Sequence, residues 1–314
     1  MHSFEIALNA VAPLFMLMAA GFIVRRAGMV DEHSLSRLNK LITYLFLPAL
    51  LFCNVYGSDW STAVNPLVIG YLALSVVISV AALWFIIPCL EPENCKRGVI
   101  IQGIFRSNAA IFGVPIAASL LGEGSLGLVA VLISVTVVLY NCFAVIVLER
   151  FNGKSTNAKA ILLGVIRNPL ILSILAAIAL KLVGLKLPEI LFSPLNSLGS
   201  VTAPLGFVLL GASFSFKSAK AHRRTLVFTV LSRLVIVPLV FLIPAYLLGI
   251  REHALVVLMI IYAAPTALSS FPMAKEFGGD DALAGEIVVF TSALCILTLF
   301  VWIYAFSALG LLPG

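Results

Sequence analysis

Long, uninterrupted apolar runs limit most strongly what this chain can fold into. A helix crosses the hydrocarbon core of a bilayer with about 20 residues, and ten segments of the chain reach that length. Only 11% of the 314 residues are charged, against about 25% in a soluble domain. A membrane β-barrel is excluded because its strands alternate over about ten residues instead of running on. The sequence predicts an all-α integral membrane protein whose ten spans cover 4–24, 36–56, 64–90, 98–121, 125–148, 160–184, 190–214, 225–249, 253–277 and 282–309.

Lysine and arginine are unevenly distributed between the connections. Fifteen lie in the connections after the odd-numbered spans, and only Lys181, Lys186 and Arg251 lie on the other side. Cytoplasmic connections are enriched in these residues, so both termini are predicted to lie outside. The net charge of +6 therefore reports membrane topology, and no nucleic-acid partner is expected.

Prolines repeat along the chain at an offset close to half its length. A shift of 156 places Pro13 on Pro169, Pro48 on Pro204 and Pro88 on Pro244, and a shift of 157 places Pro115 on Pro272. Two repeats of five spans have opposite orientations in the membrane, an arrangement typical of secondary transporters. We expect one repeat over 1–150, a cytoplasmic connector over 151–159, and a second, inverted repeat over 160–314.

Two of the predicted spans contain helix-breaking residues at matching positions. The first is "FRSNAAIFGVPIAAS" (105–119), and the second is "YAAPTALSSFPMAKEFGG" (262–279). Transporters build binding sites from such discontinuous helices. We predict that both helices are broken and cross at their prolines, with half-helices beginning near Pro115 and Pro272 and offering N–H groups to an anion. The predicted substrate-binding residues are Arg106, Ser107, Asn108, Gly113, Pro115, Pro265, Thr266, Ser269, Ser270 and Pro272.

Four polar side chains within the predicted spans have two readings each. Arg106 either contacts the ligand or extends toward the cytoplasmic surface. Arg233 is equally deep but adjoins no predicted break, which favours extension to the surface or a structural ion pair. Glu286 is a coupling-proton carrier or an interfacial carboxylate. Asn141 forms an interhelical hydrogen bond more readily than it binds a ligand.

The sequence lacks the residue patterns that several enzymatic and cofactor-binding functions require. "GEGSLG" (122–127) joins two predicted membrane helices, without the strand that a dinucleotide-binding turn requires. The phosphate-binding pattern GxxxxGK[ST] is absent, the histidines occur singly, and the cysteines have no metal-ligand spacing. We therefore expect no metal, no cofactor and no enzymatic activity.

The motifs "FRSNAAIFGVPI" and "APTALSSFPMAKEFGGD", together with five plus five spans, resemble the auxin efflux carrier family in its bacterial form. The bile acid/sodium symporters are more distant relatives of that family. The resemblance implies a homodimer formed by a scaffold of spans 1, 2, 6 and 7, and a transport domain of spans 3–5 and 8–10. It also implies a plasma (bacterial inner) membrane location. Asn108, Pro115 and Pro272 match the family's crossover residues. The long loop between spans 5 and 6 of many plant members is missing.

The sequence therefore predicts a secondary transporter or permease for a small organic anion, a mono- or dicarboxylate of the malate, malonate or auxin type. The partners expected are this anion and the lipid bilayer. The alternative is a sodium-coupled symporter of a bulkier anion. A non-transporting sensor and an intramembrane enzyme are the rivals from other classes.

Overall fold

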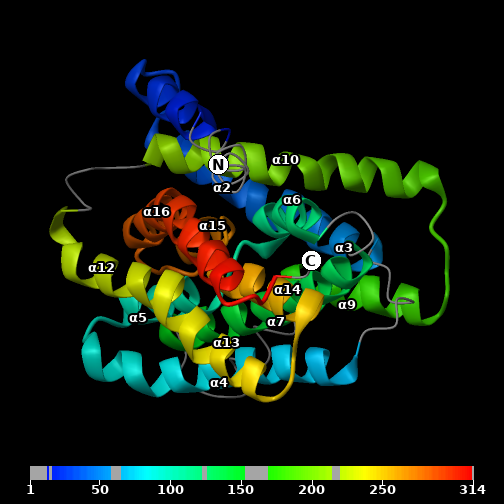
Figure 1. The fold of residues 1–314 in the computed structure, drawn as a ribbon. Helices are drawn as coiled ribbons and strands as arrows, with labels where there is room; N and C mark the ends of the chain where they lie inside the picture. Colours follow the sequence, from blue (N-terminus) through cyan, green and yellow to red (C-terminus); the bar gives the residue numbers. More distant parts are fainter. Residues whose placement is uncertain are drawn as a thin grey trace.

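The computed structural model describes residues 13, 16–57, 65–121, 126–152, 169–213 and 220–312 (Figure 1). Regular structure in these residues is helical, apart from one isolated bridge between two extended residues. Residues 16–26 form a helix. The further elements, of which η1 and η3 are π-helical, are α2 (Glu32–Leu41), η1 (Ile42–Phe46), α3 (Leu47–Gly57), α4 (Pro66–Leu90), α5 (Asn94–Phe105), α6 (Ala109–Leu121), α7 (Leu126–Asn152), α9 (Pro169–Leu182), α10 (Glu189–Ser213), α12 (Arg223–Leu231), η3 (Ser232–Ile236), α13 (Val237–Leu247), α14 (Glu252–Ala263), α15 (Ser270–Glu276) and α16 (Asp281–Ala308).

Six helical stretches of the described residues are long and apolar enough to cross a membrane: Glu32–Gly57, Pro66–Leu90, Val131–Phe151, Glu189–Ala212, Arg223–Leu247 and Asp281–Ala308. This confirms the predicted all-α membrane class. The count of ten spans stays a prediction. The predicted spans 4–24 and 160–184 lie partly outside the described residues, and those at 98–121 and 253–277 are each interrupted.

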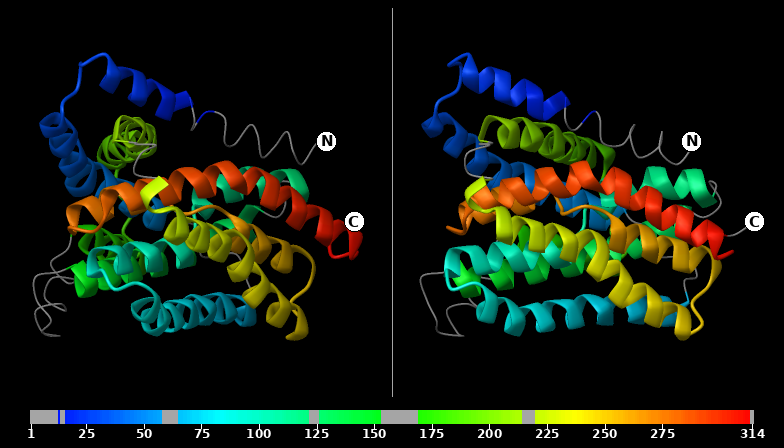
Figure 2. Two further views of the ribbon diagram at one scale, coloured as in Figure 1. Left: turned by 90° about the vertical axis from the view of Figure 1, so that its left-hand side faces the viewer. Right: turned by 60° about the vertical axis from the view of Figure 1, so that its left-hand side comes forward.

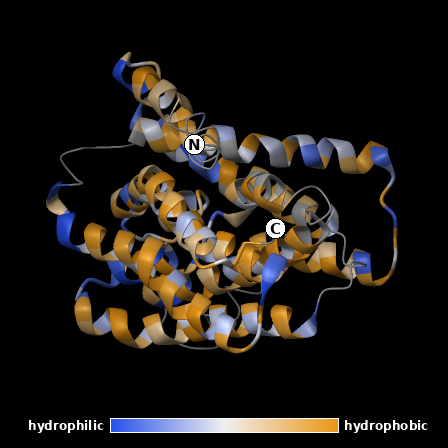
Figure 3. Ribbon diagram, viewed as in Figure 1, coloured by the Kyte–Doolittle hydropathy of each residue, from blue (hydrophilic) through white to orange (hydrophobic). Residues whose placement is uncertain are grey.

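The outer helices carry the apolar surface that a bilayer requires. On α4, Phe85 is 74% exposed, and on α13, Leu247 is 76% exposed. Hydrophobic residues cover most of both helices, and hydrophilic residues gather toward helix ends and connections (Figure 3). Leaving apolar area in water costs about 25 cal/mol per Å², so these faces fit contact with lipid.

The helices pack in two groups. Elements α2, η1, α3, α9 and α10 pack against one another, and the other group comprises α4 to α7 with α12 to α16. α10 and α4 run along opposite sides of the molecule (Figure 1). Contacts between the groups involve α15 with α2 and η1, α7 with α3, and α16 with α10. A site between the groups would therefore be lined by residues far apart in the sequence.

Glycines allow the helix of residues 16–26 to approach α10 at backbone distance. A Cβ atom on Gly21 would lie 1.9 Å from the Val208 carbonyl oxygen, and one on Gly211 would lie 1.9 Å from that of Met18. Small residues permit such approach between membrane helices. Figure 2 shows this helix, in dark blue, on the outer side of α10.

Pro115 does not interrupt its helix, so the prediction of a break there is wrong. It lies within α6, which begins at Ala109. A proline removes one hydrogen bond, and surrounding membrane helices tolerate such a loss. The interruption lies earlier, where Arg106 ends α5 with extended dihedrals (φ −93°, ψ 115°). The structure describes the backbone of Pro115 but not its side chain.

Candidate functional site

The interruptions of α5/α6 and α14/α15 lie directly against each other. Ser107 and Thr266 form an antiparallel bridge. The Asn108 N–H donates to the Pro265 carbonyl at 2.7 Å, and the Ala267 N–H donates to the Arg106 carbonyl at 3.3 Å. The backbone groups exposed by one break are therefore partly satisfied by the other.

Local sequence explains where each break falls. Ala264, which ends α14, has ψ 150°, because a residue preceding proline is pushed out of the helical region. On the other side, the Asn108 carbonyl accepts from the Phe112 N–H at 3.1 Å, so Asn108 stands immediately before the first turn of α6. Asparagine is among the residues preferred there.

Arg233 satisfies the carbonyls left free at the ends of both α5 and α14. Its Nη1 donates to Ile104 and Phe105 (3.0 and 3.3 Å), its Nη2 to Ile261 and Tyr262 (3.0 and 2.7 Å), and its Nε to Ala264 (2.9 Å). Guanidinium offers five N–H donors, which matches the five acceptors. A cation at two helix C-termini is also favoured by both helix dipoles.

The prediction that Arg233 extends to the surface, or forms an ion pair, is wrong. Its side chain is fully buried, and its partners are backbone carbonyls. It lies in η3, and π-helical turns frequently occur at functional sites. The Thr266 hydroxyl satisfies a further carbonyl near the end of α5, because it donates to the Gly103 carbonyl oxygen at 2.7 Å.

A cavity of about 260 Å³ adjoins the paired interruptions. One wall comes from α3 and α10, including Leu47, Leu51 and Thr202, and the opposite wall comes from the α5/α6 and α14/α15 breaks and from α7. The lining residues are Ile42, Leu47, Leu50, Leu51, Arg106, Ser107, Asn108, Ala109, Thr136, Val137, Tyr140, Asn141, Thr202, Gly206, Ala267, Leu268, Ser269 and Pro272. The site is thus formed between the two groups of helices.

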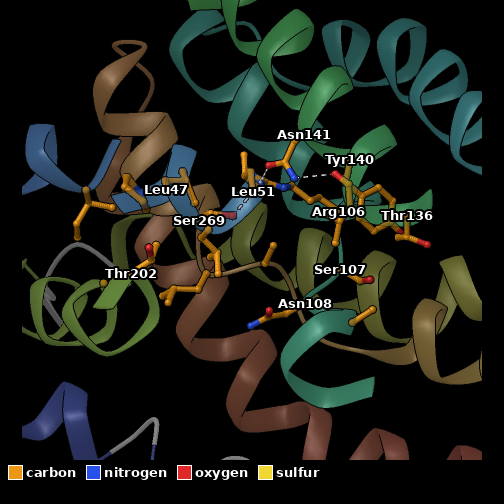
Figure 4. A pocket seen from close by; sticks show the side chains of 18 residues that line it. Leu47, Leu51, Arg106, Ser107, Asn108, Thr136, Tyr140, Asn141, Thr202 and Ser269 are labelled. Atoms are coloured by element: carbon orange, nitrogen blue, oxygen red, sulfur yellow. Dashed lines mark hydrogen bonds between the residues drawn. The ribbon is translucent and has the colours of Figure 1, made fainter. Parts of the chain in front are cut away.

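Arg106 places a positive charge in the wall of this cavity. It is 2% exposed, and its Nη2 donates to the Ser269 hydroxyl at 2.7 Å and to Asn141 Oδ1. Its Nη1 lies 3.0 Å from the Met273 sulfur. Figure 4 shows the Arg106, Asn141 and Ser269 side chains directed toward one another. Among the described residues no carboxylate pairs with Arg106.

Other polar groups of the lining also have unused hydrogen-bonding capacity. Within the described part of the chain, Asn108 Nδ2 and Thr202 Oγ1 are buried without a hydrogen-bond partner. A buried polar group left unpaired costs about 1–3 kcal/mol. Both groups line the Arg106 cavity, so a ligand with oxygen acceptors would satisfy them together with the guanidinium.

Some of the predicted substrate-binding residues line the cavity, and others do not. Arg106, Ser107, Asn108, Ser269 and Pro272 line the cavity, as does Asn141.

Four others have structural contacts instead. Pro265 and Thr266 take part in the crossing. The Ser270 carbonyl accepts from Gln102 Nε2 at 3.0 Å. Gly113 faces Ile133, whose Cδ1 would lie 3.0 Å from an added Cβ, so it serves helix packing.

The start of α15 does not offer free N–H groups at Pro272, contrary to the prediction. The N–H groups of Ser270 and Phe271 donate to the carbonyls of Ala267 and Leu268, at 3.0 and 3.2 Å, and proline has no N–H. The cationic character of the site therefore rests on Arg106.

Glu286 lines a different cavity from Arg106 and pairs with His222. It is 1% exposed, and its Oε2 lies 3.0 Å from His222 Nδ1. The reading of Glu286 as an interfacial carboxylate does not fit this burial.

The sequence interpretation missed three polar lining residues, Thr136, Tyr140 and Thr202. Thr136 and Tyr140 are four residues apart on α7 and share a helix face with each other, but they precede Asn141 by five residues and one residue, so helical periodicity counted from Asn141 does not point to them. Thr202 comes from α10, and no sequence signal connects it to the crossing.

Apolar helices around a cationic cavity fit a multi-pass membrane protein of the transport class. The chain belongs to the family described as "Membrane transport protein", whose family model matches residues 6–303. This confirms the membership inferred from the two motifs. The family and its relatives are transporters and not enzymes.

Three relatives match over nearly their whole length. An "Uncharacterized transporter" of Methanocaldococcus jannaschii is 23% identical over 95% of this chain and 98% of its own. A Rhizobium meliloti protein named "Putative malonate transporter" is 25% identical over 97% of both chains. The Escherichia coli transporter YfdV is 22% identical over 93% of this chain and 95% of its own.

Proposed function

We propose that the protein is a secondary carrier that moves a small organic anion across the plasma membrane by alternating access around the paired interruptions. One observation carries the proposal: Arg106 is buried in a cavity wall without a carboxylate partner among the described residues. A charge held away from water is costly unless it is paired. An anionic ligand supplies that pair.

The chemistry of the lining favours a carboxylate. Guanidinium presents parallel N–H donors that match two carboxylate oxygens. The Asn108 amide and the Thr202 hydroxyl add donors to the same cavity. Ligand pockets usually span about 300–1,000 Å³, so a cavity of about 260 Å³ suits a molecule of few heavy atoms.

The position of the cavity supports alternating access. Its walls belong to two helix groups, so sliding or rotation of one group past the other would change which side the cavity opens to. The predicted division into a scaffold of spans 1, 2, 6 and 7 and a transport domain of spans 3–5 and 8–10 follows the same boundary. The homodimer stays a prediction, and light scattering of the detergent-solubilised protein tests it.

The predicted inverted repeat supports the proposed topology, with both termini outside. Both interruptions occur in the fourth predicted span of a repeat and involve 106–108 and 264–269. The stretch Arg223–Leu247 is one continuous candidate span. A cysteine at Lys220 is therefore expected to react with impermeant reagents from the cytoplasm, and one at Arg251 from outside. Labelling of both from the same side would contradict this topology.

Transport is tested in proteoliposomes at a fixed membrane potential. Malonate is the first probe because one relative carries it in its name, followed by malate, acetate and indole-3-acetate. We expect uptake of at least one of them, chemically unchanged, and a raised unfolding temperature in its presence. Uptake only with sodium would support the sodium-coupled alternative. Binding without flux would indicate a sensor, and neither binding nor flux would overturn the proposal.

A further inference from the structure

A second cluster of ionisable side chains lies around the first turns of α16, and its residue Glu286 lines a different cavity from Arg106. Glu286 Oε2 lies 3.0 Å from His222 Nδ1, and His222 Nε2 lies 3.5 Å from Asp280 Oδ2. The imidazole therefore stands between two carboxylates. Glu286 is 1% exposed, and its Oε1 has no hydrogen-bond partner among the described residues.

An imidazole that stands between two carboxylates can donate to both only when it carries a second proton. A neutral imidazole has one N–H, so its second nitrogen would direct a lone pair at a carboxylate oxygen. An added proton removes the conflict in either of two places. On the imidazole, it makes both nitrogens donors; on Glu286, it makes an O–H that donates to Nδ1 while Nε2–H faces Asp280. The pair is therefore built to hold a proton.

Glu286 also lines a second cavity, of about 380 Å³, in which the other charges are already paired. The Lys275 Nζ lies 3.4 Å from Glu32 and 3.2 Å from Asp281, and Arg25 lies 3.4 Å from Glu32. With all carboxylates ionised, Arg25 and Lys275 (+2) against Glu32, Asp281 and Glu286 (−3) leave the lining at −1. This excess favours a cation or proton over a second anion.

The remaining ionisable neighbours leave His222 as the partner of Glu286. In the first turn of α5, Lys96 pairs with Glu93 at 2.6 Å, and the Cys95 carbonyl accepts a hydrogen bond from the Asp280 N–H at 2.9 Å. Arg233 in η3 is occupied by carbonyls. α10 meets this turn of α16 through Leu210, which lies 2.9 Å from a Cβ added at Gly285.

The second cavity lies at the same contact between the two helix groups as the Arg106 cavity. Gly206 and Pro272 line the Arg106 cavity, while Leu210 and Phe271 line the second one. Both cavities thus use successive turns of α10 and neighbouring residues of α15. Gly285, which precedes Glu286, faces Leu210 of α10, so a change in the charge of Glu286 acts next to the contact between α16 and α10.

We propose that Glu286 and His222 bind the proton that is coupled to anion transport, an inference that rests on the function proposed above. The proton bound is the one counted above, shared between Glu286 Oε2 and His222 Nδ1. No further ion is required at this site.

The test compares wild type, Glu286→Gln, His222→Gln and the control Glu189→Gln in proteoliposomes. The probe is the carboxylate that the wild type transports, malonate first. Accumulation is measured under an imposed pH gradient at clamped membrane potential, and counterflow is measured at equal pH. We expect the gradient to drive accumulation by the wild type and by Glu189→Gln, whose carboxylate is exposed at the start of α10 and lines neither cavity. Glu286→Gln should lose gradient-driven accumulation completely and retain counterflow, and His222→Gln should lose the same accumulation.

Wild-type counterflow without any response to the pH gradient would overturn the proton site alone and leave the carrier intact. A full gradient response in Glu286→Gln would do the same. If Glu286→Gln does not fold, His222→Gln decides by the same measurement. Absence of wild-type counterflow with every carboxylate would overturn the proposed function, and the proton site with it.

Discussion

Arg106→Ala is expected to abolish carboxylate uptake in proteoliposomes while leaving the folded protein in the membrane. The substitution removes the charge of the cavity lining, so the ligand loses its counter-ion. Hydrogen bonds to charged groups contribute about 1.5–3 kcal/mol, which corresponds to about 10- to 150-fold in affinity. The fold should survive, because the change also removes a buried charge that has no carboxylate partner among the described residues.

Two further variants sharpen this prediction. Arg106→Lys keeps the charge but loses the fork that donates to Ser269 and Asn141, so we expect a large loss of affinity with the fold retained. Arg251→Ala is the matched control, because it removes an exposed guanidinium that contacts the Tyr246 ring. Its uptake should equal that of the wild type. Normal flux in Arg106→Ala would show that the anion does not depend on this charge.

Arg233→Ala is expected to prevent stable folding. It leaves five buried carbonyls, at the ends of α5 and α14, without their donor. At about 1 kcal/mol for each acceptor, the loss is about 5 kcal/mol, which is at the upper end of single-substitution effects. We expect little monodisperse protein after detergent extraction and a strongly lowered unfolding temperature.

The comparison with Arg233→Lys separates charge from hydrogen bonding. Lysine keeps the cation near both helix C-termini but has three donors and not five, so an intermediate unfolding temperature is expected. Arg106→Ala, made in parallel, should unfold close to the wild-type temperature. Equal unfolding temperatures for Arg233→Ala and the wild type would show that the carbonyls find other donors, and would remove the structural role assigned to Arg233.

Features that depend on a single segment of the chain could be predicted from the sequence. Apolar runs predicted the helical membrane class, and the two motifs predicted where the chain departs from helix. Arg106, Asn108 and Ser269 lie within those motifs and line the cavity. Pro115 misled the placement of the first break, because proline within a packed membrane helix need not end it.

Residues whose roles depend on distant backbone could not be found in this way. The acceptors of Arg233 are main-chain carbonyls at least 28 residues away, and carbonyls have no sequence signature. His222 and Glu286 are separated by 64 residues, so neither predicts the other. Thr202 reaches the cavity only because α10 packs across the crossing.

The central claim is that a carboxylate binds beside Arg106, and equilibrium binding tests it most directly. The carboxylate that gives the strongest thermal stabilisation is titrated calorimetrically into wild type, Arg106→Ala and Arg251→Ala at matched protein concentration. The account predicts equal affinity for wild type and Arg251→Ala, and an affinity about 10- to 150-fold lower for Arg106→Ala. Equal affinity for all three proteins would contradict it.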